Sequence, residues 1–217
     1  MARKRVAILI SGRGSNMAAL IAAAKEKDYP AEIALVCSNR PDAGGLALAR
    51  AAGIETTVVD HAPFGKDREA FEHALDAALE KNRIELVCLA GFLRVLTPYF
   101  VGRWEGRLIN IHPALLPAFK GLDTHERALA AGVKIHGASV HFVVPEMDSG
   151  PCIAQAAVPV LETDDADSLA ARVLKAEHKL FPLALRLLAE GRARMANGRC
   201  VVDAPRDPDG MMIVPET

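Results

Sequence analysis

Short apolar runs alternate with helix-forming segments over the first half of the chain, and this alternation restricts the fold more than any other feature. Runs rich in Val, Ile, Leu and Ala predict buried strands at residues 6–10, 33–38, 54–59, 86–90 and 108–111. The segments between them predict helices at residues 17–25, 45–52, 67–82 and 98–104. Strands that alternate with helices form parallel sheets with right-handed crossovers. The first half therefore predicts an α/β fold, a Rossmann-like sheet with helices on both faces.

The pattern changes after residue 117. A helix is predicted at 124–131, followed by a long strand at 135–144, a turn at 146–151 and a returning strand at 152–158, which together indicate an antiparallel hairpin. A long helix at 166–190 contains Pro182, which removes one internal hydrogen bond and should kink or divide it. We expect a single domain over 1–217, with a core at about 5–190 and a partly mobile C-terminal extension at 191–217.

Charge and hydropathy exclude several classes of protein. The formal net charge is −1, so there is no electrostatic case for binding nucleic acid or an anionic membrane surface. No apolar run reaches the roughly 18 residues that span a bilayer, and the run after the basic N-terminus is too short for a signal peptide. The four cysteines are dispersed without a C-x-x-C pair, as in reduced cytosolic proteins. We expect a cytoplasmic protein.

A glycine-rich loop, Ser11-Gly12-Arg13-Gly14-Ser15-Asn16, separates the first predicted strand from the first helix. Free backbone N–H groups and the positive end of the helix dipole meet at such a loop, so it can bind an anion. A dinucleotide site is excluded by Met17, which stands where a third glycine is needed, and no Gly-Lys-Ser/Thr follows to make a P-loop. We predict a single-phosphate site at Gly14, Ser15 and Asn16, with Ser15 or Asn16 as the helix N-cap; a plain tight turn is the alternative.

Two polar side chains lie at the end of the strand predicted at 108–111, one within the strand and one directly after it. Asn110 and His112 are two residues apart and therefore project to the same side, and Pro113 ends the strand directly after them. Polar groups at the end of a buried strand are where open α/β sheets place their chemistry, although a satisfied core Asn and a loop His remain the alternative. Asp148, in the later turn, could favour the protonated imidazole. An acid and an amide oxyanion donor without a nucleophile elbow suit direct acyl transfer between two bound substrates.

At this point the motifs match a known family. The chain resembles the phosphoribosylglycinamide formyltransferases, folate-dependent enzymes of purine synthesis, over roughly residues 5–190. The resemblance is carried, in the expected order, by Ser11-Gly12-Arg13-Gly14-Ser15-Asn16, Ala90-Gly91-Phe92-Leu93-Arg94-Val95-Leu96, Asn110-Ile111-His112-Pro113-Ala114-Leu115-Leu116-Pro117, His136-Gly137-Ala138-Ser139-Val140-His141-Phe142 and Asp148-Ser149-Gly150-Pro151. It implies the formyltransferase fold.

The resemblance also implies an activity. The formyl group of 10-formyltetrahydrofolate, a co-substrate, would pass to the amine of 5′-phosphoribosylglycinamide (GAR), without a metal. Asn110 would bind the formyl oxygen, His112 would donate a proton, and Asp148 would keep His112 protonated. The implied GAR-binding residues are Gly14, Ser15, Asn16 and Glu177. The implied folate-binding residues are Arg68, which would reach the distal acidic end, Asn110, and Leu93, Arg94, Val95 and Leu96, which would receive the pterin through backbone groups. Ser139 and His141 are implied to line the site.

Several alternatives stay open. Asp123 stands where some family members have a histidine, which puts that position's role in doubt, and His125, His136 and His178 could be structural or peripheral. A metal site at His112, His141 and Asp148 has no supporting ligand spacing. Rival functions are a 10-formyltetrahydrofolate hydrolase, a methionyl-tRNA formyltransferase, which would need a further RNA-binding domain, and a non-catalytic nucleotide-binding module. The protein could be a monomer or a homodimer.

Overall fold

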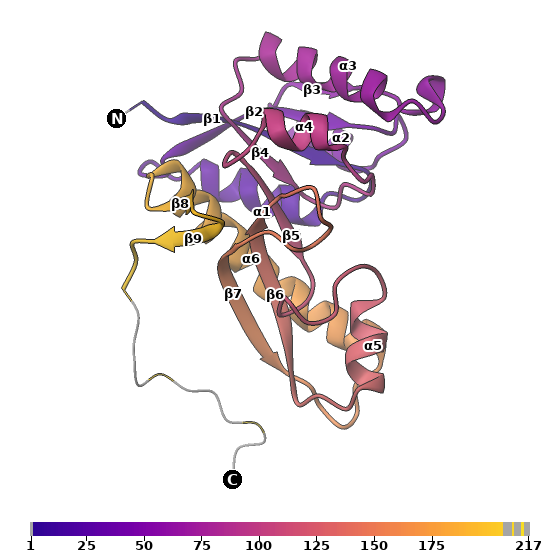
Figure 1. Cartoon of the computed structure of the whole chain (residues 1–217), viewed down its shortest axis with the longest axis vertical. Coiled ribbons are helices and arrows are strands. Elements are labelled where there is room, and N and C mark those ends of the chain that lie inside the picture. Colours follow the sequence, from indigo (N-terminus) through magenta and orange to yellow (C-terminus); the bar gives the residue numbers. More distant parts are fainter. Residues whose placement is uncertain (1, 206–209, 211–213, 215–217) are drawn as a thin grey trace.

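A seven-stranded sheet forms the centre of the protein in a computed structural model, which describes residues 2–205, 210 and 214 (Figure 1). Its strand order is β3-β2-β1-β4-β5-β6-β7, and β8 and β9 form a separate two-stranded sheet. The strands are β1 (Lys4–Ile10), β2 (Ala31–Ser38), β3 (Thr56–Val58), β4 (Leu86–Leu89), β5 (Leu108–His112), β6 (Ile135–Phe142), β7 (Cys152–Pro159), β8 (Ala193–Ala196) and β9 (Arg199–Val202).

The direction of the strands changes once across the sheet. Strands β1 to β5 pair in parallel, whereas β5 with β6 and β6 with β7 pair antiparallel. The predicted fold class is confirmed: a mostly parallel α/β sheet that ends in an antiparallel hairpin and a long helix. The parallel strands are almost continuously apolar because helices cover both of their faces.

Helices divide between the two faces according to their apolar stripes. The helices are α1 (Ser15–Ala24), α2 (Gly45–Ala51), α3 (Arg68–Lys81), α4 (Pro98–Arg103), α5 (Thr124–Ala130) and α6 (Ala166–Ala189), with a short 3₁₀ turn, η1 (Ala62–Phe64). Side chains of α1, α2 and α6 enter one buried cluster, and those of α3 and α4 enter a second cluster on the opposite face. Phe181 on α6 and Phe71 on α3 are fully buried representatives of the two clusters.

Two local predictions differ from the structure. The N-cap of α1 is Gly14, with φ 78° and no side-chain cap, so the prediction of Ser15 or Asn16 was wrong. This position needs glycine because its backbone is left-handed and an added Cβ would lie 3.0 Å from the Cα of Gly45. Pro182 does not divide α6, which runs unbroken from Ala166 to Ala189 because its strongly apolar face packs on the sheet.

The sequence predicted no strand after α6, only a partly mobile C-terminal extension at 191–217. Instead β8 and β9 pair as a hairpin that contacts α6 and β7. The expected mobility of 191–217 concerns in part residues 206–209, 211–213 and 215–217, which lie outside the described residues. The single-domain organisation over 1–217 therefore stays a prediction. Over the described part of the chain, no helix is both long enough and apolar enough to cross a membrane.

The strand order reverses between β1 and β4, and this fixes where a ligand can bind. From β1 the chain continues to β2 and β3 on one side, and from β4 it continues to β5 on the other. The loops that leave the carboxyl ends of β1 and β4 therefore diverge and leave a crevice between them. The glycine-rich loop follows β1, and the loop at 90–97 follows β4.

Gly150 gives a test of how tightly the turn before β7 is packed. An ideal Cβ at Gly150 would lie 1.7 Å from the carbonyl oxygen of Phe142, whereas one at Gly102, inside α4, would meet nothing within 4 Å. We expect Gly150→Ala to lower the free energy of unfolding by about 3 kcal/mol, because backbone must move. Gly102→Ala should instead keep or slightly raise it. Urea unfolding measures both, and equal stability of the two variants would contradict the close packing.

Candidate active site

A cavity of about 1140 Å³ opens at the carboxyl ends of β1, β4 and β5. Its other walls come from the β6–β7 turn, the start of α5 and one side of α6. The cavity brings together most of the residues that the sequence singled out: Ser15, Asn16, Leu93, Arg94, Val95, Leu96, Asn110, His112, His141, Asp148 and Glu177.

Strand β5 supplies the first two polar side chains, and the turn after β6 supplies the third. Asn110 pairs with His141 in the antiparallel register, and His112 pairs with Ser139. Asp148 has a positive φ of 50°, and its Oδ2 accepts a hydrogen bond of 2.9 Å from the backbone N–H of Gly121. This bond ties the turn that carries Asp148 to the loop that follows β5.

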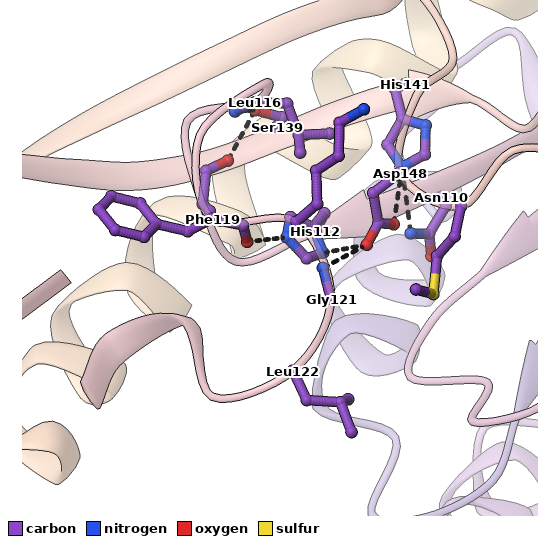
Figure 2. A network of polar contacts seen from close by, with 12 residues as sticks. Asn110, His112, Leu116, Phe119, Gly121, Leu122, Ser139, His141 and Asp148 are labelled. Atoms are coloured by element: carbon purple, nitrogen blue, oxygen red, sulfur yellow. Dashed lines mark hydrogen bonds and ion pairs between the residues drawn. The ribbon is translucent and has the colours of Figure 1, made fainter. Parts of the chain in front are cut away.

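The imidazole of His112 lies between two acceptors (Figure 2). Its Nε2 lies 3.0 Å from the carbonyl oxygen of Phe119, and its Nδ1 lies 3.5 Å from Oδ2 of Asp148. A carbonyl oxygen only accepts hydrogen bonds, so Nε2 carries a proton. At Nδ1 the nearly buried carboxylate of Asp148 is positioned to accept from a second N–H. Each ring nitrogen of His112 therefore faces an oxygen acceptor.

His141 is a second buried imidazole beside Asp148, whose Oδ1 lies 3.8 Å from its Nε2. Burial lowers the pKa of His141 below its usual range, and the nearby Phe142 carbonyl and Asp148 only partly offset this effect. Its Nδ1 donates to the carbonyl oxygen of Phe142 over 2.8 Å. In the neutral ring Nε2 is then an acceptor, and Nδ2 of Asn110 donates to it over 3.2 Å. His141 thereby fixes the orientation of the Asn110 amide.

Ser139 does not line the cavity, so that prediction needs correction. Its side chain is fully buried beneath the loop that follows His112. The hydroxyl donates to the carbonyl oxygen of Ala114 over 2.7 Å and accepts from the N–H of Leu116 over 2.9 Å. Its position in β6 is opposite His112, but the loop itself covers it. Ser139 therefore supports the loop from below.

Glu177 of α6 meets the glycine-rich loop at one end of the cavity. Its Oε2 accepts a hydrogen bond of 2.7 Å from Nδ2 of Asn16. Burial raises the pKa of Glu177 above its usual value, and the bond from Asn16 only partly opposes this. Gly14 contributes backbone conformation rather than cavity surface, since it packs against Gly45. The first-turn amides of α1 have no intrahelical acceptor and can bind an anion.

The loop after β4 forms the opposite end of the cavity. Its Leu93 N–H donates to Oγ of Ser11 over 2.9 Å, so this amide is already occupied. In the described part of the chain, the backbone amides of Arg94, Val95 and Leu96 have no hydrogen-bond partner. The N–H groups of residues 94–96 are therefore the backbone donors of this loop that remain available to a ligand.

Arg68 lies outside the main cavity. It lines a neighbouring hollow of about 700 Å³ together with Lys66 and Arg94. Arg94 lines both spaces, and its guanidinium stacks over the Phe71 ring at 4.8 Å from the ring centroid. The two spaces thus adjoin at Arg94, and Asp67 and Glu69 also line the smaller one.

The sequence left open the roles of three histidines and of Asp123. His125 and Asp123 line the cavity, and Asp123 has a φ of 55° at the start of α5 without a side-chain cap. His136 is 1% exposed and packs against His125, and burial lowers its pKa to about 4. His178 is half-buried on α6 and is absent from the cavity lining. The positions of His136 and His178 therefore fit a structural or peripheral role, whereas His125 borders the cavity.

Sequence reasoning missed the carbonyl of Phe119, the N–H of Gly121 and the hydroxyl of Ser11. Backbone groups leave no signal in residue identity, and Phe119 reaches His112 only because the loop folds back with a φ of 54° at that residue.

A metal was not expected. Within the residues that the structure describes, no group of three or more His, Cys, Asp or Glu side chains is arranged to hold one.

Comparisons with known protein sequences show the family of the chain. The family model described as "Formyl transferase" matches residues 4–185. Phosphoribosylglycinamide formyltransferase of Escherichia coli is 44% identical, over 94% of this chain and 95% of that protein. The trifunctional purine biosynthetic protein adenosine-3 of Bos taurus is 48% identical over 91% of this chain, but the chain spans only 20% of its length.

Comparisons with solved structures show the same family. Glycinamide ribonucleotide transformylase 1 from Symbiobacterium toebii superposes with a TM-score of 0.89 at 43% identity, covering 93% of this chain and 95% of that one. A formyltetrahydrofolate deformylase from Pseudomonas syringae pv. tomato is more distant in sequence. Its TM-score is 0.85 at 27% identity, covering 92% of this chain and 66% of that one.

The raised pKa of Glu177 predicts how stability changes with pH. The folded state binds the proton more tightly than the unfolded state does, so its stability falls as pH rises from the ordinary glutamate value through the raised one. Glu177→Gln mimics the protonated carboxyl and can still accept from Asn16. We therefore expect this variant to have a higher Tm than the wild type at pH 8, with the difference shrinking toward pH 5.

The matched control is Glu105→Gln, which removes the same charge from an exposed position. Thermal unfolding at several pH values compares the variants. The assignment would be wrong if Glu177→Gln were less stable than the wild type at pH 8, or if Glu105→Gln gave the same pH-dependent difference.

Proposed function

The chain belongs to the formyl transferase family, among the phosphoribosylglycinamide formyltransferases, and is an enzyme of that family. From this premise we propose that it transfers the formyl group of 10-formyltetrahydrofolate to the amine of GAR, giving formyl-GAR in purine biosynthesis, in the cytoplasm. Its partners are these two small molecules. The observation that carries the proposal is the convergence of Asn110, His112 and Asp148 on one cavity, between an anion loop and a second open loop.

The reaction needs no covalent enzyme intermediate. The neutral amine of GAR attacks the formyl carbon, and the carbonyl electron pair moves onto oxygen. When the tetrahedral intermediate collapses, the bond from the formyl carbon to N10 of the folate breaks. The attacking nitrogen loses one proton and N10 gains one, so the proton count balances. What the protein must supply is stabilisation of the oxyanion and a group that carries a proton at neutral pH.

His112 fits the role of proton donor through one particular nitrogen. Nε2–H is already hydrogen-bonded to the Phe119 carbonyl, whereas Nδ1 lies 3.5 Å from Asp148, too long for a strong hydrogen bond. We assign the catalytic proton to Nδ1–H, which can leave the loose carboxylate contact and pass to N10 of the folate as the bond to the formyl carbon breaks; the proton lost by the attacking nitrogen then restores His112. Asp148 then acts by charge, stabilising the cationic ring before the proton is donated.

Asn110 fits the role of oxyanion donor. One N–H of its amide is held by the neutral His141 ring, which leaves the other N–H free to donate into the cavity. An amide fixed in this way needs little reorganisation when charge develops on the formyl oxygen, and such preorganised donors contribute strongly to rate.

The glycine-rich loop suits the phosphate of GAR. Gly14 sets the backbone so that the amides of Ser15 and Asn16 begin the helix, where an anion is stabilised. Glu177 lies beside Asn16 and is the group that would contact the substrate amine. A carboxyl and an anion site at one end of the cavity match the two ends of a small phosphorylated amine.

The opposite end suits a flat heteroaromatic ring with a polar edge. The free amides of Arg94, Val95 and Leu96 can bind such an edge. Large apolar side chains are unusually exposed at the cavity rim, with Leu93 at 77% and Leu122 at 78%. Exposed apolar groups around a concave site usually cover a ligand. Arg68 and Arg94 in the adjoining hollow would bind the acidic end of the folate.

An assay with 10-formyltetrahydrofolate tests the proposal. Loss of the formyl group is expected only when GAR is present, with formyl-GAR as the product. Release of formate at the same rate without GAR would identify a hydrolase, the activity named for the Pseudomonas syringae relative. No turnover with either acceptor would leave a nucleotide-binding module.

His112→Ala tests the proton donor. Because positioned acid catalysis contributes about 10²–10⁴-fold, we expect kcat to fall by about that factor while GAR binds with nearly unchanged affinity. Steady-state kinetics and calorimetric titration with GAR measure the two quantities. His73→Ala, an exposed position on α3, is the matched control and should retain wild-type kcat. A His112→Ala enzyme with a near-normal rate would exclude this role.

A further inference from the structure

Ser11 occupies the point where the strand order reverses, but its hydroxyl has no place in the reaction described above. It follows the last residue of β1 and is buried, with 3% of its surface exposed. Its backbone N–H donates to the carbonyl oxygen of Gly91 over 3.0 Å, which joins the start of the glycine-rich loop to the start of the loop after β4. The two loops that form opposite ends of the cavity thus meet at this residue.

The side chain of Ser11 makes two further bonds, one in each direction. Its hydroxyl donates to Oδ1 of Asn39 over 2.6 Å and accepts from the N–H of Leu93 over 2.9 Å. Asn39 is itself buried after β2, and its carbonyl oxygen lies 2.7 Å from Nδ1 of His61. The single hydroxyl proton is committed to Asn39, so the oxygen presents its lone pair to Leu93. Only a hydroxyl can make both bonds at this place.

A second buried side chain holds the far end of the same loop. The backbone N–H of Thr97 donates to Oε1 of Glu72 over 2.7 Å, and the Thr97 hydroxyl bonds to the other carboxylate oxygen. Between these two anchors lie the three residues with free amides, 94–96. Their position relative to His112 therefore depends on where Leu93 is held, and Ser11 holds it.

We propose that Ser11 is a positioning residue for the formyl donor: its hydroxyl, bonded to Leu93 and Asn39, fixes the loop segment that receives the flat polar ring of the folate. The inference rests on the proposed function for the identity of the ligand. Ser11 touches no substrate and is absent from the cavity lining, so it acts through Leu93. Its loss should weaken donor binding without weakening GAR binding, because the first turn of α1 keeps its own support from Gly14 and Gly45.

Ser11→Ala tests this selectivity. We expect the KM for 10-formyltetrahydrofolate to rise about tenfold, the loss of roughly one well-placed hydrogen bond. The kcat and the KM for GAR should stay within about twofold of the wild type. Ser11→Thr keeps a hydroxyl and should restore most of the donor affinity.

Ser38→Ala is the matched control. Ser38 is a buried serine at the end of the neighbouring strand β2, and its hydroxyl bonds only within its own loop, to the backbone of Arg40. The Ser38→Ala variant also loses a buried serine hydroxyl at the end of a strand, but it should leave both KM values unchanged. The proposal is overturned if Ser38→Ala reproduces the effect, or if Ser11→Ala raises the two KM values by the same factor.

Hydrogen exchange gives a readout that does not depend on turnover. The Leu93 amide should exchange faster in Ser11→Ala than in the wild type, and unchanged exchange would overturn the proposal. Inactivity of the wild type would overturn the proposed function, and with it the choice of ligand, whereas the exchange result separately decides whether Ser11 holds the loop. If Ser11→Ala does not fold, Asn39→Ala removes the hydroxyl's acceptor, and we expect it to raise the donor KM about threefold.

Discussion

The antiparallel register between β5 and β6 is the constraint on which the rest of the site depends. It places Asn110 opposite His141 and His112 opposite Ser139. A shift of one residue would turn both β5 side chains to the other face of the sheet. The apolar residues of β5 hold the register, since Ile109 is fully buried within the core. Packing of the sheet thus determines the alignment of the polar groups.

Two buried imidazoles, His112 and His141, lie beside the same carboxylate but have different hydrogen-bond partners. His112 has an acceptor at each ring nitrogen, and His141 has an acceptor at one and a donor at the other. Asp148 lies between the rings, with Oδ2 3.5 Å from Nδ1 of His112 and Oδ1 3.8 Å from Nε2 of His141. The proposed proton donor and the ring that orients the Asn110 amide therefore share a single carboxylate.

The sequence was sufficient for the fold and for most of the polar side chains that meet in the cavity, but not for the contacts between loops. Alternating apolar runs predict parallel strands because burial requires them, and spacing puts Asn110 and His112 on one side. Ser139 was misplaced because a strand pattern reveals a face but not the loop that covers it. The bond from Leu93 to Ser11 joins residues 82 apart through a backbone amide, for which residue identity carries no information.

The contact between Gly14 and Gly45 has a consequence for redesign of the anion loop. An added Cβ would lie 3.0 Å from backbone at Gly14 and 2.7 Å from Ile10 at Gly45, so neither position can accept a new functional group. Gly12 has no such neighbour, because nothing lies within 4 Å of its ideal Cβ, and its backbone is not left-handed. An engineer who wants this scaffold to accept a different charged acceptor molecule should therefore diversify residue 12 and leave the two touching glycines unchanged.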